Sequence, residues 1–160
     1  KCLVRGASFP PAPHGTGRVL YPPSNVRAKA ADDAALVVRL EIGEKFHVLL
    51  LSDSGTKTEE ALLAAPNELA SDILIKGRHY SGEVDLEQFI DAVQPKLIIA
   101  SSIAFPARER VPDDWAQAIR ARGITLVRRA GSGGGRRGVE GGRGGARPVC
   151  GQQTCRSPGR

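Results

Sequence analysis

The chain has 160 residues, of which 41% are hydrophobic and 25% are charged, and this composition excludes a wholly disordered or collagen-like protein. Aromatic residues make up only 4% of the chain, so its core must be built mainly from aliphatic side chains. The formal net charge is +6, and residues 131–160, with six Arg and one Glu, supply nearly all of it. The rest of the chain is close to neutral, which argues against a general basic surface for nucleic acid.

The first part of the chain predicts a lead-in followed by three strands. Residues 1–17 contain several Pro and Gly and no apolar periodicity, so we expect them to be irregular. A short strand is predicted over residues 18–21. Apolar stretches over residues 35–42 and 46–51, separated by a turn that contains Gly43, predict a β-hairpin.

Three helices then alternate with three strands. The helices are expected over residues 56–65, 85–93 and 112–122, and the strands over residues 73–76, 96–101 and 124–127. We expect Thr56 or Thr58 to cap the first helix, and Leu86, Phe89, Ile90 and Val93 to line one face of the second. This order predicts an α/β fold in which the helices cover one face of a sheet, and a layer from residues before Lys1 would cover the other.

Residues 131–160 differ sharply from the rest, because eleven of these thirty residues are Gly and few are apolar. Such a segment does not offset the entropy lost on ordering, so we expect a disordered Gly/Arg-rich tail. Its Gly-Gly-Arg-Gly-Gly spacing is weakly similar to an RNA-binding Arg-Gly segment; the alternatives are a plain flexible tail or a read-through in the wrong frame. Cys150 and Cys155 have no neighbouring His, so no zinc site is expected there.

Two of the predicted strands end in polar residues that suit ligand or metal binding. Asp53 follows the strand at 46–51, and His79 follows the strand at 73–76. Ligands gather at the carboxyl ends of strands in α/β sheets, and neutral imidazole is the commonest metal ligand. The alternative for Asp53 is a turn or a helix cap before Thr56, and the alternative for His79 is a structural role.

Several segments, taken in order, resemble one known family. They are residues 33–40, the hairpin, and residues 51–53, 72–79, 89–96 and 122–124. Together they are similar to the metallo-β-lactamase-fold domain at the C-terminus of ComEC-type competence proteins, which are membrane channel proteins that internalise DNA during transformation. The similarity covers residues 18–130 and implies a partial αββα sandwich, its C-terminal half.

The resemblance also implies two metal ligands. The family has Gly-Asp where this chain has Ser52 and Asp53, and it has Gly-His-His-Gly-Ser where this chain has residues 77–81. Asp53 therefore matches the carboxylate that bridges two metal ions in the family. His79 matches the second His of the pair, whereas Arg78 stands in place of the first.

These matches imply a degenerate metal site. The main metal motif of the family, His-x-His-x-Asp-His, is absent from the chain. A dinuclear site needs several His and a shared carboxylate, so two ligands are expected to bind zinc weakly or not at all, and no catalytic residue is assigned. Arg78 and Ser81 are expected to be binding residues, since a guanidinium repels a cation but holds a phosphate.

Three functions follow from these features. The first is a fragment of a catalytically degenerate hydrolase-like domain from a DNA-uptake protein, with DNA and the membrane channel portion of the parent as partners. The second is a metal-dependent phosphodiesterase or nuclease on DNA, whose missing ligands would come from the lead-in, where His14 is the spare candidate, or from another chain. The third is a non-enzymatic nucleic-acid binder that uses the Arg-Gly tail. The resemblance implies a parent in the bacterial inner membrane, while the chain itself is expected to be soluble, with no transmembrane segment and no small-molecule cofactor.

Overall fold

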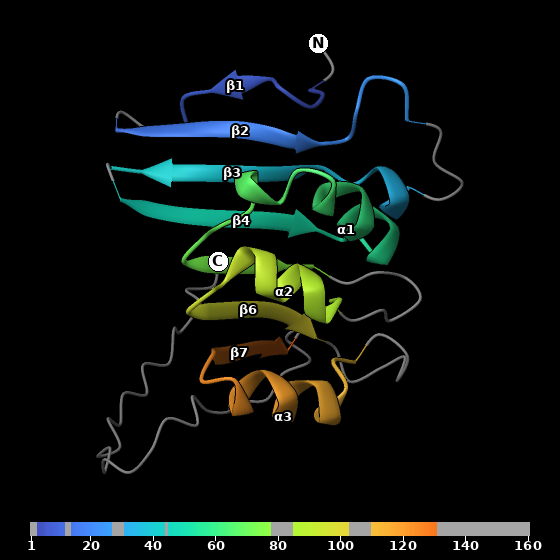
Figure 1. Ribbon diagram of the computed structural model, residues 1–160, viewed down its shortest axis with the longest axis vertical. Helices are drawn as coiled ribbons and strands as arrows, with labels where there is room; N and C mark the ends of the chain where they lie inside the picture. Colours follow the sequence, from blue (N-terminus) through green and yellow to red (C-terminus); the bar gives the residue numbers. More distant parts are fainter. Residues whose placement is uncertain are drawn as a thin grey trace, which may run out of the picture.

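The computed structural model describes residues 3–11, 14–26, 31–43, 45–77, 85–102 and 110–130. Within these residues the chain forms one seven-stranded sheet and three α-helices, which confirms the predicted α/β class (Figure 1). The strands are β1 (Ser8–Phe9), β2 (Gly15–Tyr21), β3 (Val37–Ile42), β4 (Phe46–Ser52), β5 (Ile73–Lys76), β6 (Leu97–Ser102) and β7 (Thr125–Ala130), and the helices are α1 (Thr56–Leu63), α2 (Glu87–Val93) and α3 (Asp113–Ala121). The predicted tail at 131–160 lies outside the described residues.

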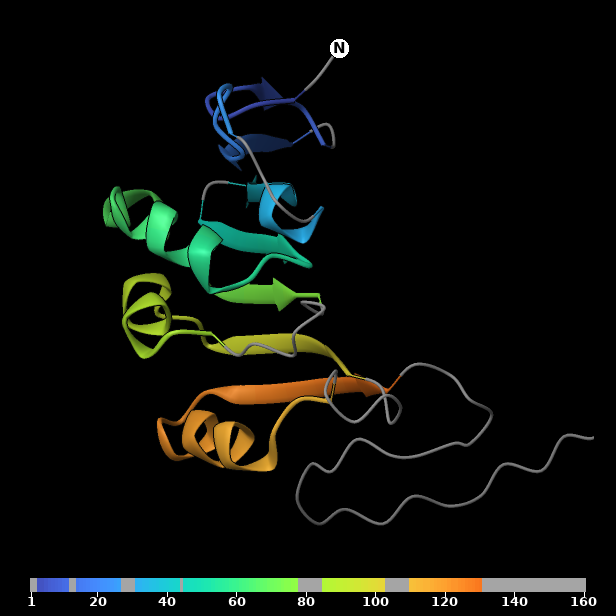
Figure 2. The ribbon, with the colours of Figure 1, turned by 90° about the vertical axis from the view of Figure 1, so that its right-hand side faces the viewer.

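The strands follow one another across the sheet in chain order, from β1 at one edge to β7 at the other. The first four are antiparallel neighbours and include the predicted hairpin β3–β4, whose turn uses Gly43 with a φ of +64°. The strands from β4 to β7 are parallel neighbours, and a helix joins each to the next. Such crossovers are almost always right-handed, and because the strand order advances in one direction, all three helices lie on the same face of the sheet (Figure 2).

The core lies between these helices and the sheet. Its buried side chains are Leu20 and Tyr21 on β2, Val37 on β3, Leu49 and Leu51 on β4, Leu74 on β5, Ile98 on β6, Leu62 on α1, Phe89, Ile90 and Val93 on α2, Ile119 on α3, and Leu69, which precedes β5. Most of them are aliphatic, as the low aromatic content requires. Three residues of the predicted apolar stripe of the second helix are buried in this core, and the fourth, Leu86, lies just before the helix and is partly buried against the core.

The alternate residues of the same strands form an apolar surface on the other side of the sheet, which we call the open face. Its residues are Val38, Leu40 and Ile42 on β3, Phe46, Val48 and Leu50 on β4, Ile73 and Ile75 on β5, Leu97 and Ile99 on β6, and Val127 on β7. None of the three α-helices lies on this side (Figure 2). Ile42 is 50% exposed and Phe46 43% exposed. Parallel strands that are apolar on both sides are typical of sheets covered on both faces, so the open face suits a second layer.

The prediction that residues 1–17 are irregular is wrong in part. Ser8–Phe9 pairs with β2 as a short strand, and β2 begins at Gly15, earlier than predicted. The reason is a contact between an aromatic ring and a glycine. A Cβ at Gly17 would come within 2.6 Å of the Phe9 ring, so the ring covers a position that only glycine leaves open.

The ends of the first helix also differ from the prediction. The residue before α1 is Gly55, which has no side chain with which to make a capping hydrogen bond, so neither Thr56 nor Thr58 holds the capping position. The helix ends at Leu63, and Pro66 begins a separate 3-10 turn, Pro66–Glu68, because proline lacks the N–H that a longer helix needs. Of the helices that the structure describes, none has the length and hydropathy needed to cross a bilayer.

Candidate site at the carboxyl ends of strands β4 and β5

Because β4 and β5 are parallel neighbours, their carboxyl ends reach the same edge of the sheet. Ser52 pairs with Lys76 at this edge, and the Gly77 N–H donates to the Ser52 carbonyl oxygen just beyond it. In open α/β sheets ligands bind outside the carboxyl ends of the strands. The two predicted polar segments therefore leave the sheet side by side, at the edge where a ligand site is expected.

Ser52 has a left-handed backbone, with a φ of +53°. The pairing register between β4 and β5 shifts between Leu50 and Ser52, so the chain turns sharply out of the sheet at this residue. A left-handed conformation costs an L-residue about 1–2 kcal/mol, whereas glycine adopts it freely. The backbone at position 52 is therefore one that glycine fits better than serine.

Asp53 lies directly against Gly77. A Cβ at Gly77 would come within 1.9 Å of Asp53 Oδ1 and within 2.4 Å of the Ser52 carbonyl oxygen. The turn after β4 and the segment after β5 thus approach so closely that only glycine fits at position 77. The contact places the Asp53 carboxylate against the start of the segment that leads to residues 78–81.

A hollow of about 360 Å³ opens beside this contact. Apolar side chains of β3, β4 and β5 and of the residue before β3 line it, together with polar groups at the strand ends. These residues are Leu36, Val38, Leu50, Ile75, Ser52, Lys76, Gly77 and Ser101. The hollow therefore connects the strand-end edge with the open face, and an apolar hollow with a few polar groups is the usual form of a small-molecule site.

Of the four predicted site residues, the structure describes one. It describes Asp53 and places it at the expected strand end, just after β4. Arg78, His79 and Ser81 lie outside the described residues, and only the path of the chain up to Gly77 is known. The Asp53 carboxylate lies against Gly77, the last described residue before His79. The position of the imidazole itself stays a prediction.

The expectation that His14 supplies a further metal ligand at this edge is wrong. The His14 carbonyl oxygen accepts the Gly43 N–H at 2.9 Å, in the turn between β3 and β4. The strand β4 has 7 residues and a strand rises about 3.3 Å per residue, so the turn lies at the far end of β4 from Asp53. His14 therefore lies beside the amino end of β4, whereas Asp53 follows its carboxyl end.

Among the described residues, no three His, Cys, Asp or Glu side chains lie close enough together to hold a metal ion. Zinc takes four protein ligands in structural sites and three in catalytic sites. Asp53 is the predicted ligand within the described part of the chain, so this part supplies one of the ligands that zinc requires. Any zinc bound at this edge would need further ligands from the segment after Gly77.

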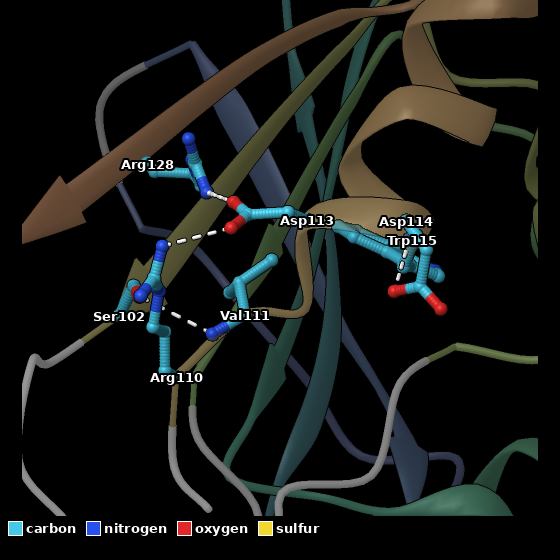
Figure 3. Close-up of polar contacts among 7 residues, drawn as sticks. All are labelled: Ser102, Arg110, Val111, Asp113, Asp114, Trp115 and Arg128. Carbon is cyan, nitrogen blue, oxygen red and sulfur yellow. Dashed lines mark hydrogen bonds and ion pairs between the residues drawn. The ribbon is translucent and has the colours of Figure 1, made fainter. Parts of the chain in front are cut away.

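The neighbouring strand end, at β6, holds structural contacts (Figure 3). Ser102 Oγ accepts the Val111 N–H at 3.3 Å, and the Asp113 carboxylate accepts hydrogen bonds from Arg128 at 2.7 Å and from Arg110 at 2.8 Å. The hydrogen bond from Arg128 and the charge of Arg110 hold the pKa of Asp113 below its usual value. Asp113 therefore fixes the start of α3 to β7.

The sequence analysis did not predict three buried charged residues near the carboxyl ends of β4 and β5. Lys76 ends a strand whose other residues are apolar, Glu59 stands in the first turn of α1, and Asp85 precedes α2. The one signal in the sequence is the lysine itself, since a lysine within a buried strand requires an acidic partner.

Comparison with protein-family models and with curated proteins gives no match to the chain. The fold and the site therefore define a class. It is an α/β protein with one mixed sheet, helices on one face, an apolar surface on the other, and a ligand-sized hollow at the carboxyl ends of two parallel strands.

Proposed function

We propose that the chain is the C-terminal half of a metallo-β-lactamase-fold domain like that of ComEC-type DNA-uptake proteins, with a degenerate metal site. The backbone at Ser52 and Asp53 is the main support. The family has Gly-Asp at this place, and here Ser52 keeps the left-handed conformation that suits glycine. The carboxylate that follows it lies against Gly77, the first residue of the segment matched to Gly-His-His-Gly-Ser.

The open face supports the same proposal. A half sandwich is one sheet with helices on one side and an apolar surface on the other, and that surface packs against a second sheet about 10 Å away. The exposed apolar side chains Ile42, Phe46 and Val127 stand on that side of this sheet. In this proposal the second layer comes from another part of the parent protein.

The metal chemistry of the site is expected to be weak. A pair of metal ions in such a site supplies a hydroxide nucleophile at neutral pH. Asp53 and His79 supply two ligands for it, and Arg78 places a positive charge where a third ligand would stand. The guanidinium of Arg78 instead suits a phosphate of the DNA backbone, with Ser81 as a second binding residue. The site then binds DNA next to the membrane channel portion of the parent and does not cleave it.

A zinc titration with a nuclease assay tests this proposal. We expect the full chain to bind less than one zinc per molecule at micromolar concentrations and to leave DNA uncut with zinc, manganese or magnesium present. Asp53→Asn is the matched control, because it removes the described ligand and keeps the shape of the side chain. Tight binding of one or more zinc ions with DNA cleavage that Asp53→Asn abolishes would instead establish an active phosphodiesterase.

A further inference from the structure

A cluster of buried charged side chains joins α1, β5 and the start of α2 on the helix side of the sheet. We call Glu59, Asp85 and Lys76 the carboxyl cluster. Lys76 Nζ donates to Asp85 Oδ1 at 2.8 Å, and Glu59 Oε2 accepts the Leu86 N–H at 2.8 Å. Glu59 is only 1% exposed, and the other two are buried as well. The ring of Trp115, on α3, lies 5.2 Å from Lys76 Nζ.

The charges of the carboxyl cluster balance only if one carboxyl group keeps a proton. Two ionised carboxylates beside one ammonium group would leave a net negative charge in a place almost without solvent. A buried charge without a partner is costly, and such a group commonly takes up a proton instead. Among the described charged groups, Asp85 faces Glu59 from the start of α2 and Lys76 faces it from β5, while α3 faces the cluster with the neutral Trp115 ring.

A missing hydrogen-bond donor shows which carboxyl group carries the proton. Asp85 Oδ2 is buried and has no donor among the described residues. Glu59 already accepts the Leu86 N–H with Oε2, and its side chain lies within hydrogen-bonding reach of Asp85, so its other oxygen can carry a proton toward Asp85. Burial, then the negative charge of Asp85 and a hydrogen bond with it, raise the pKa of Glu59 to about 9. A proton on Glu59 that is donated to Asp85 therefore accounts both for the unpartnered Asp85 Oδ2 and for the raised pKa of Glu59.

We propose that Glu59 and Asp85 share one proton at neutral pH, and that loss of this proton in alkaline solution opens the junction between α1, β5 and α2. At neutral pH the Glu59 hydroxyl donates to Asp85 Oδ2, and Lys76 balances the remaining charge of Asp85. When hydroxide removes the proton as water, two carboxylates face each other with one ammonium between them. Their repulsion separates α1 from the residues that lead into α2. This inference does not depend on the proposed function.

The direction of the pH effect follows from the two states of Glu59. Its pKa is about 9 in the folded chain and 4.5 as an ordinary glutamate, so between these values the folded chain holds a proton that the unfolded chain has lost. The contribution of Glu59 to stability therefore falls as the pH rises through this window. The unfolding equilibrium constant is expected to grow up to about tenfold for each pH unit because of this one group.

Urea unfolding of the full chain between pH 5 and pH 9 tests the proposal. Trp115 is the only tryptophan and lies against Lys76, so its fluorescence reports on the cluster directly. Glu59→Gln keeps a hydrogen-bond donor and an acceptor but does not ionise. We therefore expect the free energy of unfolding of this variant to fall less steeply between pH 5 and pH 9 than that of wild type. Glu60→Gln is the matched control on the exposed side of α1 and is expected to keep the wild-type pH dependence.

Equal pH dependence in wild type and Glu59→Gln would overturn the proposal. Should Glu59→Gln not fold, the wild-type chain still decides the matter through the carbon chemical shifts of its glutamate carboxyl groups. We expect one glutamate signal to stay at the protonated position from pH 5 to pH 8. If every glutamate carboxyl of the folded chain titrates below pH 6, the shared proton does not exist.

Discussion

Gly77→Ala is expected to destabilise the folded chain by about 3 kcal/mol, at the upper end of what overpacking costs, because the backbone contact that it would crowd cannot be relieved by a side-chain movement. The added Cβ would lie 1.9 Å from Asp53 Oδ1, which can rotate away, but also 2.4 Å from the Ser52 carbonyl oxygen, which belongs to the backbone. The turn after β4 must then move away from β5. Urea denaturation of the variant and of wild type measures the difference in the free energy of unfolding.

Two other substitutions serve as controls for this prediction. Gly43→Ala lies in a turn with open space around it and a φ of +64°, so it bears only the cost of a left-handed backbone, about 1–2 kcal/mol. Ser52→Gly relieves that same cost and is expected to stabilise the chain by about 1 kcal/mol. A Gly77→Ala loss no larger than that of Gly43→Ala would show that the two strand ends do not touch as described.

Lys76→Met is expected to cost about 3–5 kcal/mol of folding free energy, because it leaves a buried carboxylate without its cation. Lys76 Nζ lies 2.8 Å from Asp85 Oδ1, and the two side chains are only 9% and 1% exposed. Thermal or urea unfolding at pH 7 measures the loss. Adding Asp85→Leu to Lys76→Met removes the orphaned charge and is expected to recover most of the stability.

The matched control is an ion pair of the same length on the surface. Lys96 Nζ lies 2.7 Å from Asp72 Oδ1, but the lysine side chain is 83% exposed. Water and salt screen such a pair, so Lys96→Met should leave the free energy of unfolding nearly unchanged. Similar losses for Lys76→Met and Lys96→Met would mean that burial does not set the strength of these pairs, which would contradict the account of the carboxyl cluster.

The parts of the fold that rest on local pattern could be predicted from the sequence. The strand Ile73–Lys76 is predicted with its observed limits, because a short apolar run stands between polar segments. The apolar stripe of α2 is confirmed, because Phe89, Ile90 and Val93 follow the helical period. Alternation of helices and strands also gave the α/β class.

Features that depend on contacts between distant residues could not be predicted in the same way. In the pairing of β1 with β2 the Phe9 ring covers Gly17, a contact that no periodicity reveals. At the candidate site, the sequence indicated Asp53 at a strand end but not its contact with Gly77. Glu59 stands in the first turn of α1, where the local sequence favours an acid, and only the fold buries it beside Asp85, 26 residues further along the chain.

Zinc affinity of Arg78→His, measured by competition with a chromogenic chelator, tests the degenerate metal site most directly. The substitution restores the His pair that the family carries beside Asp53, and a third ligand is what a zinc site of this kind lacks. We expect an affinity at least about tenfold higher than that of wild type, or about 1.4 kcal/mol. Arg78→Gln removes the positive charge without adding a ligand, so its gain in zinc affinity over wild type should be much smaller. If Arg78→His brings no gain in zinc affinity, or an equal gain when Asp53→Asn is also present, Asp53 and the segment after β5 do not form one metal site, and the proposed function is contradicted.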